Sequence, residues 1–389
     1  KTIVKKINLI RFGKPYIGRK EVSEVSKVMQ SAWIGTGEQS EKFEQQFAKF
    51  KKVKYAVSLN SCTAALHLSL VALGIKKGDE VITSSLTFCS TINSIILSGA
   101  KPVLVDIKSD TFNIDESKIE SKINKRTKAI IPVHFGGLAC SMHKIKKIAK
   151  KHSLKIVEDC AHSIEGILNN KHLGTFGDTG CFSFYANKNI TTGEGGMLVT
   201  NNKLIYEKAK ILRLHGMSRD SWKRYGVKNN KVSKFMNYDV VDVGFKYNMT
   251  DMTAAMGLVQ LKKIILMWRE RNLINKYYFK ELKNLPIKFQ TKTSTKIKHA
   301  HHLFVFILDS KKHDRSKIIN LLNKKGIGAT VHYNSLYSFS VYKKMFNWKA
   351  KDFPISDYIC NNIVSLPIYP GLKKFEMIYI TKILKELLK

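Results

Sequence analysis

The sequence predicts an α/β fold in which a large, doubly wound, mostly parallel sheet is followed by a smaller α+β unit. Helical and strand periods alternate over roughly the first 200 residues, and the strand candidates are short continuous apolar runs. The alternation fades near residue 205, ahead of one long helical stretch. Strands that alternate with helices are typical of doubly wound sheets, which bind ligands at the carboxyl ends of their strands.

The elements follow in order along the chain. Apolar residues at helical spacing predict helices over 21–29 and 41–50. Runs typical of buried parallel strands come next, at 56–59, 80–83, 102–106, 129–133 and 155–158. Helix-length segments separate them, at 64–73, 91–97 and 142–152.

The second part of the chain begins with a helix-like stretch over 252–282. A strand over 302–308, a helix over 316–325 and a helical C-terminus follow it. We therefore expect a large α/β domain over 1–265, including the N-terminal segment, and a small α+β domain over 266–389.

Composition excludes several classes of protein. The chain has 389 residues with 44% hydrophobic and 10% aromatic content, which excludes a disordered chain. No apolar run approaches the roughly 20 residues that span a bilayer, and the basic N-terminus lacks the apolar core of a signal peptide. Six scattered cysteines without a CxxC pair suggest reduced thiols rather than disulfides or a zinc site. We expect a cytoplasmic enzyme that does not associate with a membrane and does not bind a metal ion.

The net charge of +37 makes nucleic-acid binding a hypothesis to weigh. The lysines, however, are spread along the whole chain and no aromatic-interleaved basic stripe accompanies them. A solvated basic surface that attracts an anionic substrate is favoured. A basic nucleic-acid-binding protein on an inactive enzyme scaffold stays the less favoured alternative.

The most informative segment runs from Cys181 to Gly196. Lys188 lies there between an apolar strand-like run and a glycine-rich turn, and a second apolar run follows the turn. An amine held partly desolvated at a strand end is neutral near physiological pH and forms a Schiff base with a carbonyl. This pattern favours a pyridoxal phosphate lysine over an ordinary surface lysine.

Three further features suit the same cofactor. Asp159 ends the strand before Lys188, where its carboxylate keeps a pyridine nitrogen protonated, although it also suits a helix cap. The segment Asn60–Leu66 joins a strand to a helix with small hydroxylic residues, which suits a phosphate or a simple N-cap at Ser61 or Thr63. Phe88 follows the next strand, where it is placed either to stack on the ring or to join the core.

These features resemble the DegT/DnrJ/EryC/StrS family of sugar aminotransferases, which are fold-type I pyridoxal phosphate enzymes. The resemblance covers nearly the whole chain. Its motifs here are Ser61-Cys-Thr-Ala-Ala-Leu66, Gly78-Asp-Glu-Val81, Pro102-Val-Leu-Val-Asp106, Glu158-Asp-Cys-Ala-His-Ser163, Phe182-Ser-Phe-Tyr-Ala-Asn-Lys188, Leu212-Arg-Leu-His-Gly-Met217, Gly326-Ile-Gly-Ala-Thr-Val-His-Tyr333 and Leu366-Pro-Ile-Tyr369.

The resemblance implies a role for each matching residue. Lys188 binds the cofactor aldehyde and moves the proton between substrate carbon and cofactor carbon, and Asp159 pairs with the pyridine nitrogen. The remaining cofactor contacts are phosphate binding by Ser61, Thr63, Ser183 and the Cys62 N–H, stacking by Phe88, and a place near the ring hydroxyl for His162.

Two positions depart from the family pattern. Cys62 replaces the usual glycine before Thr63. It is therefore open how closely the backbone approaches a phosphate at this position. The segment that resembles the family's Gly-x-Asn-x-Arg reads Gly244-Phe-Lys-Tyr-Asn-Met-Thr250, so Lys246 and Asn248 replace Asn and Arg. In the family this segment reaches the cofactor of the partner subunit. We therefore expect a homodimer. Whether Lys246 or Asn248 reaches the cofactor of the partner subunit stays open.

Within the family, Lys188 argues for transamination, because related sugar dehydratases carry a histidine there. The segment Lys188-Asn-Ile-Thr-Thr-Gly-Glu-Gly-Gly196 and His162 are typical of members that aminate C4. The resemblance implies glutamate as donor and a nucleotide-linked 4-keto-6-deoxy sugar as acceptor, with Trp33 and His332 shaping the sugar pocket. A C3-specific sugar enzyme and an aminotransferase for a non-sugar ketone, such as an aminocyclitol precursor, stay open as alternatives.

Overall fold

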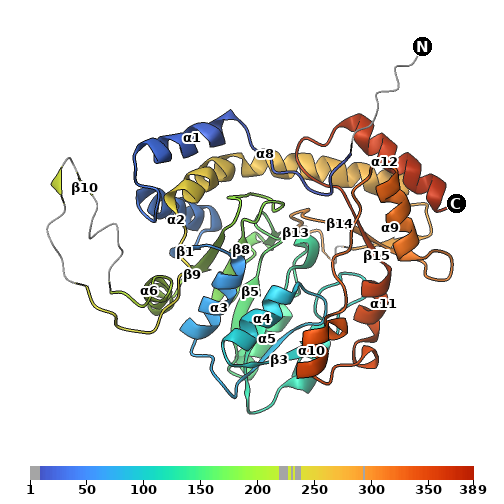
Figure 1. Cartoon of the computed structure of the whole chain (residues 1–389). Helices are drawn as coiled ribbons and strands as arrows, with labels where there is room; N and C mark the ends of the chain where they lie inside the picture. The colour runs from blue at the N-terminus through green and yellow to red at the C-terminus, as the bar shows by residue number, and fades with distance from the viewer. Residues whose placement is uncertain (1–8, 219–226, 229–230, 233–237, 292–293) are drawn as a thin grey trace.

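A computed structural model describes residues 9–218, 227–228, 231–232, 238–291 and 294–389 (Figure 1). Most of the basic N-terminal segment, on which the expectation about a signal peptide rests, lies outside the described residues. No helix among the described residues is both long enough and apolar enough to cross a bilayer.

The large unit is built on a seven-stranded sheet in the order β1-β9-β8-β5-β4-β2-β3. Its strands are β1 (Tyr55–Leu59), β2 (Glu80–Ser84), β3 (Lys101–Val105), β4 (Thr127–Ile131), β5 (Lys155–Asp159), β8 (Thr179–Ser183) and β9 (Gly196–Thr200). All five strands expected in the first 160 residues form, within two residues of the predicted bounds.

Strand β9 is the exception to parallel pairing, because it runs antiparallel to both β1 and β8. Its first residue, Gly196, pairs with Leu59 at the end of β1 and with Ser183 at the end of β8. The glycine-rich turn that follows Lys188 therefore lies at the carboxyl edge of the parallel strands.

Helices cover both faces of the sheet (Figure 1). Successive residues of β4 face opposite ways: Ile130 packs in one core cluster and Ile131 in another. The first cluster includes α2 (Glu38–Lys51), α5 (Met142–Lys151) and the first half of α8 (Asp251–Leu282), and α1 (Arg19–Gln30) packs along α8. The second includes α3 (Cys62–Ala72), α4 (Cys89–Leu97) and α6 (Lys203–Leu212).

The C-terminal unit is α+β, as expected. Its sheet has the order β12-β14-β15 and is antiparallel. The elements are β12 (Ile287–Phe289), β14 (Phe304–Leu308), α9 (Arg315–Lys324), α10 (Ser340–Met345), α11 (Pro354–Asn362), β15 (Ile363–Leu366) and α12 (Lys374–Leu387). The described residues also form short strands: β6 (Ile167–Leu168), β7 (Lys171–His172), β13 (Ile297–Lys298), β10 (Val227–Lys228) and β11 (Lys231–Val232).

Helix α8 runs along the top of the molecule in Figure 1. Its two halves contribute to different hydrophobic clusters. Met267 belongs to the sheet cluster, whereas Ile274 belongs to the C-terminal cluster. On this basis we propose that the boundary between the two domains lies inside α8, near the expected position 265–266. In the N-terminal segment, Ile10 packs in the C-terminal cluster and forms a parallel bridge with Ile327.

Candidate active site

A cavity of about 360 Å³ lies at the carboxyl edge of the large sheet. The ends of β5 and β8, the start of α3 and the segment 332–333 of the C-terminal unit contribute its lining. This is the place where a doubly wound sheet is expected to bind ligands.

Lys188 enters this cavity from the loop between β8 and β9, in a turn closed by its N–H donating to the Tyr185 carbonyl at 2.9 Å. Burial lowers the pKa of the amine to about 8, and the nearby Asp159 carboxylate opposes this shift. The amine therefore has a substantial neutral fraction near physiological pH, as a nucleophile for a carbonyl requires.

Asp159 ends β5 and is buried at the cavity wall. Thr91 donates its hydroxyl to Oδ2 at 2.8 Å, and the Ala161 N–H donates to Oδ1 at 3.1 Å. Burial raises the pKa of the carboxyl, while the two donors and Lys188 counteract that rise. Thr91 is a further site residue, and its contact with Asp159 joins positions that are 68 residues apart in the sequence.

The start of α3 forms another wall of the cavity, with Ser61, Cys62 and Thr63 in its lining. Ser61 is the N-cap, and its Oγ accepts from the Ala64 N–H at 3.0 Å. The capping interpretation is therefore correct for Ser61. The same helix end presents N–H groups and the positive end of the helix dipole to the cavity.

Two neighbours complete this end of the cavity. Ser183, the last residue of β8, lines the cavity beside Gly196. A Cβ at Gly196 would lie 2.3 Å from the carbonyl carbon and oxygen of Ser61, so only glycine permits this approach of β9 to α3. The Cys62 side chain is buried among the apolar residues behind α3, where burial raises its thiol pKa.

Aromatic residues form the remaining wall. Phe88 is 54% exposed and lines the cavity, with its ring centroid 5.4 Å from that of Tyr333. His162 also lines it, and both of its ring nitrogens have partners: the Gly136 N–H at 3.2 Å and the Tyr333 hydroxyl at 2.9 Å. Burial lowers the pKa of His162 well below its usual value, so this imidazole is neutral.

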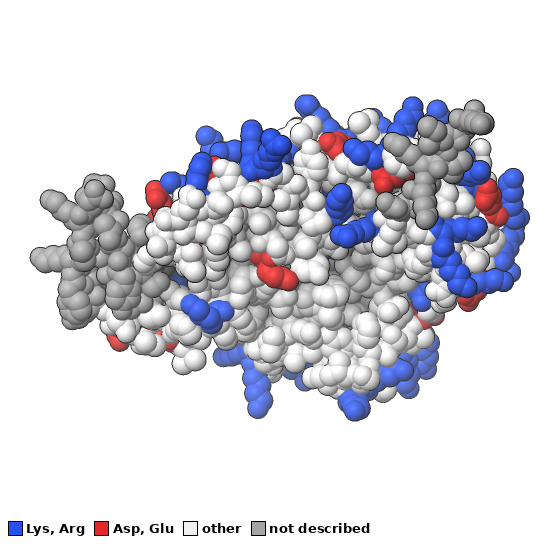
Figure 2. All heavy atoms as spheres, turned by 45° about the horizontal axis from the view of Figure 1, so that its top comes forward, with Lys and Arg blue, Asp and Glu red and all other residues white. Residues whose placement is uncertain are grey.

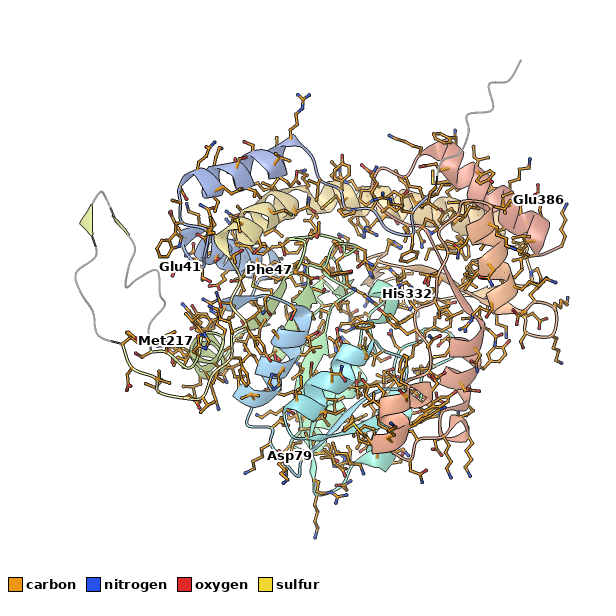
Figure 3. All side chains as sticks on the ribbon, in the orientation of Figure 1. Glu41, Phe47, Asp79, Met217, His332 and Glu386 are labelled. Carbon is orange, nitrogen blue, oxygen red and sulfur yellow. The ribbon has the colours of Figure 1, made fainter. Side chains whose placement is uncertain are left out.

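His332 lines the cavity from the C-terminal side (Figure 3). Its Nδ1 lies 2.9 Å from the Ser365 hydroxyl, and burial lowers its pKa to about 3. His302 and Tyr333 also line the cavity, in addition to the predicted site residues. Both lie beside His162, and the sequence does not indicate this because the three residues are far apart along the chain.

Three of the predicted site residues lie outside the cavity lining of this chain. Trp33 donates its indole N–H to the Thr36 carbonyl at 3.2 Å, and Asn248 donates its amide to the Thr36 hydroxyl at 2.6 Å. Lys246 is exposed beside the end of β1, where its carbonyl accepts from Asn60. Their roles toward cofactor or sugar stay predictions.

One group of possible metal ligands occurs among the described residues: His134, Glu158 and Cys160, all buried. The Glu158 carboxylate already accepts from His134 and from the N–H groups of Gly174, Phe176 and Gly177. These bonds account for the cluster as part of the folded core.

The residues present fit pyridoxal phosphate. An amine at the cavity wall, a buried carboxylate held by Thr91, and a helix start that β9 approaches only through Gly196 are the three features that this cofactor needs. In this donor set Lys188 would hold the aldehyde, Asp159 would face the pyridine nitrogen, and the start of α3 would hold the phosphate.

Comparison with known proteins agrees with this fit. The profile of the DegT/DnrJ/EryC1/StrS aminotransferase family matches residues 15–385. The spore coat polysaccharide biosynthesis protein SpsC of Bacillus subtilis is 39% identical over 390 residues, covering 100% of this chain and 99% of SpsC.

Two solved structures are similar over almost their whole length. Helicobacter pylori PseC, an aminotransferase involved in the biosynthesis of pseudoaminic acid, has a TM-score of 0.90 at 30% identity, covering 98% of this chain and 99% of PseC. Spr1654 of Streptococcus pneumoniae, a proposed sugar aminotransferase, has a TM-score of 0.90 at 30% identity in its PMP form, covering 97% of this chain and 98% of that one. It has also been solved in a PLP form.

Proposed function

The chain belongs to the DegT/DnrJ/EryC1/StrS aminotransferase family as a pyridoxal phosphate-dependent enzyme, and we propose that it transfers the amino group of glutamate to a nucleotide-linked 4-keto-6-deoxy sugar. The product is a 4-amino-4,6-dideoxy sugar nucleotide for glycan biosynthesis. The observation that carries the proposal is the placement of Lys188 and Asp159 on one cavity, beside the start of α3.

Five of the cavity residues have a task in this reaction. Pyridoxal phosphate, when bound, supplies an electrophilic carbon and an electron-accepting ring. The Lys188 amine, whose pKa burial lowers to about 8, is the nucleophile that holds the cofactor and the base that takes the α-proton of glutamate. Asp159 holds a negative charge at the pyridine nitrogen, and Ser61, Thr63 and Ser183 bind the phosphate.

Amination at C4 is the finer part of the proposal. Its support is the resemblance of Lys188-Asn-Ile-Thr-Thr-Gly-Glu-Gly-Gly196 and of His162 to members that aminate C4. The name of SpsC connects a relative to polysaccharide synthesis, which agrees with a sugar acceptor. Amination at C3 is the principal alternative, and a non-sugar ketone is the second.

A homodimer with shared active sites is also proposed, and the geometry favours Lys246 as the crossing residue. The Asn248 amide is bound to Thr36 of its own chain at 2.6 Å, whereas the Lys246 side chain is exposed. A lysine neutralises a phosphate as a point charge. Trp33 donates to the carbonyl of the same Thr36, and a place for it at the sugar pocket is part of the proposal.

The dimer proposal is tested with Lys246→Ala and the matched variant Asn248→Ala. We expect Lys246→Ala to weaken cofactor binding about tenfold, measured by fluorescence titration, at unchanged dimer mass in sedimentation. The Asn248 variant should affect cofactor binding less. Equal losses in both variants, or a monomer in solution, would contradict this assignment.

The cytoplasm is the proposed location. All six cysteines are free thiols, which suits a reducing compartment.

Product analysis tests the function. The enzyme is incubated with glutamate and with nucleotide-linked 4-keto and 3-keto 6-deoxy sugars, and the products are followed by NMR. We expect 2-oxoglutarate together with an amine at C4. An amine at C3, or turnover only with a cyclitol ketone, would select the corresponding alternative.

A further inference from the structure

A buried amide lies directly next to the nucleophilic lysine. Asn189 is 4% exposed, and its Nδ2 donates to Glu165 Oε2 at 2.6 Å and to the Ala300 carbonyl at 2.8 Å. A carbonyl oxygen only accepts hydrogen bonds, so the contact with Ala300 fixes which end of the amide is nitrogen. The amide oxygen of Asn189 then faces His302 Nδ1 at 3.0 Å.

This amide sets the tautomer of His302. Nδ1 must carry a hydrogen to donate to the Asn189 oxygen. Burial and the neighbouring Lys188 lower the pKa of His302 well below its usual value, so the imidazole is neutral. A neutral imidazole has a single N–H, and the lone pair of Nε2 is therefore left as an acceptor on a ring that lines the cavity.

The adjacent histidine has the opposite tautomer. The ring centroids of His162 and His302 lie 4.4 Å apart. His162 Nδ1 accepts from the Gly136 N–H, so its hydrogen is on Nε2 and is donated to the Tyr333 oxygen at 2.9 Å. The Tyr333 hydroxyl hydrogen is then directed away from His162. The cavity thus contains an acceptor on His302 and a donor on Tyr333.

We propose that His302 is a specificity residue for the acceptor substrate, whose Nε2 accepts a hydrogen bond from a hydroxyl of the sugar ring. Glu165 and Asn189 are the positioning residues that hold the tautomer. This inference rests on the proposed function, because it assumes a hydroxylated acceptor. A hydroxyl donates to His302 and accepts from Tyr333, whereas the carboxylates of glutamate have no hydrogen to donate.

Separate measurement of the two half-reactions tests the proposal in holoenzyme with stopped-flow absorbance. In His302→Asn the side-chain amide still donates to Asn189, but the shorter side chain places no acceptor at the former position of Nε2. We expect kcat/KM for the sugar to fall about tenfold or more, while the value for glutamate changes by less than about threefold. His302→Gln is the matched variant: its longer amide places an oxygen near the former Nε2, and part of the sugar activity should return.

A second measurement does not depend on turnover. Holoenzyme that contains ¹⁵N-labelled histidine is studied by long-range ¹H–¹⁵N NMR. The His302 signal is identified as the one that is missing in His302→Gln. It should show a protonated Nδ1 and an unprotonated Nε2. A protonated Nε2 would overturn the proposal, and so would equal losses in both half-reactions of His302→Asn. If glutamate or the keto sugar fails to react with the native enzyme, the proposed function fails instead, and the spectrum still tests the tautomer.

Discussion

Burial and neighbouring acidic groups shift the pKa of Lys188 in opposite directions. Burial disfavours the ammonium form, and the Asp159 carboxylate in the same cavity favours it. Burial is the larger influence and lowers the pKa to about 8, compared with about 10.4 for a free lysine. The site therefore keeps an amine that is both a proton acceptor and a nucleophile near neutral pH.

The first prediction concerns this amine. The rate at which apoenzyme captures pyridoxal phosphate should rise with pH and level off above about pH 8, because the neutral form of Lys188 is the reactive one. Growth of the Schiff-base absorbance measures the rate. A rise that continues to pH 10 would show that the cavity leaves the lysine pKa unshifted.

Glu165 provides a prediction about stability. Burial raises its pKa from 4.5 to about 7, although Arg271 and Asn189 oppose the shift. Between these pH values the folded protein holds a proton that the unfolded chain has released, so the free energy of unfolding falls as pH rises. The loss is at most about 3 kcal/mol. Glu165→Gln removes this contribution and still accepts from Asn189.

Chemical denaturation at pH 5, 6, 7 and 8 measures that effect. The stability of Glu165→Gln relative to the native protein should increase over this range. Parallel profiles for the two proteins would mean that Glu165 titrates like an exposed carboxyl.

Single residues show how far the sequence could define the site. Lys188 and Asp159 were predictable, because a strand end and a glycine-rich turn are local patterns. Thr91, Tyr333 and His302 were not, because each acts through a partner that is distant in sequence: the contacts are Thr91–Asp159, Tyr333–His162 and His302–Asn189. Only the packing of the C-terminal unit against the sheet edge brings the last two pairs together.

Among the elements, strand β9 decides how closely the glycine-rich turn approaches the start of α3. We predict that Gly196→Ala displaces this contact, because the new Cβ would lie 2.3 Å from Ser61 backbone atoms. Such overpacking costs about 1–3 kcal/mol and should weaken phosphate binding at the same edge. Denaturation and cofactor titration measure the two effects.

Gly18→Ala is the matched control for that variant, since its Cβ would meet only Glu21 at 3.7 Å. It should leave cofactor affinity unchanged. Normal cofactor affinity in Gly196→Ala would contradict the account of the phosphate end.

Strand direction is what sequence reasoning could not supply at this scale. The run 197–199 is apolar, but apolar character alone does not show whether a short strand pairs with parallel or antiparallel neighbours. The order β1-β9-β8 places the antiparallel strand between two parallel ones, and this depends on the connection through Lys188. The expected helices were predictable to within a few residues, since helical spacing repeats over several turns.

At the scale of the whole molecule, charge is the dominant feature. The chain carries a net charge of +37, and Figure 2 shows Lys and Arg around the rim of one face with few charges in its middle. A positive field raises the encounter rate with an anionic substrate and is screened by salt. We predict that kcat/KM for the nucleotide sugar falls several-fold to about tenfold between 20 and 300 mM salt.

The kcat value should change little over the same range, because bound substrate no longer depends on steering. Initial rates at several salt concentrations provide both parameters. A kcat/KM that does not depend on salt would assign the lysines no role in substrate capture.

The central claim is that Lys188 in this cavity holds the cofactor and moves the proton in the transfer of an amino group from glutamate to a keto sugar. The absorbance spectrum of purified protein with pyridoxal phosphate, taken before and after glutamate and then after a 4-keto sugar nucleotide, tests it most directly. We predict a Schiff-base band that glutamate bleaches and the sugar restores, and that is missing in Lys188→Ala. A band that persists in glutamate, or the same band in Lys188→Ala, would contradict the account.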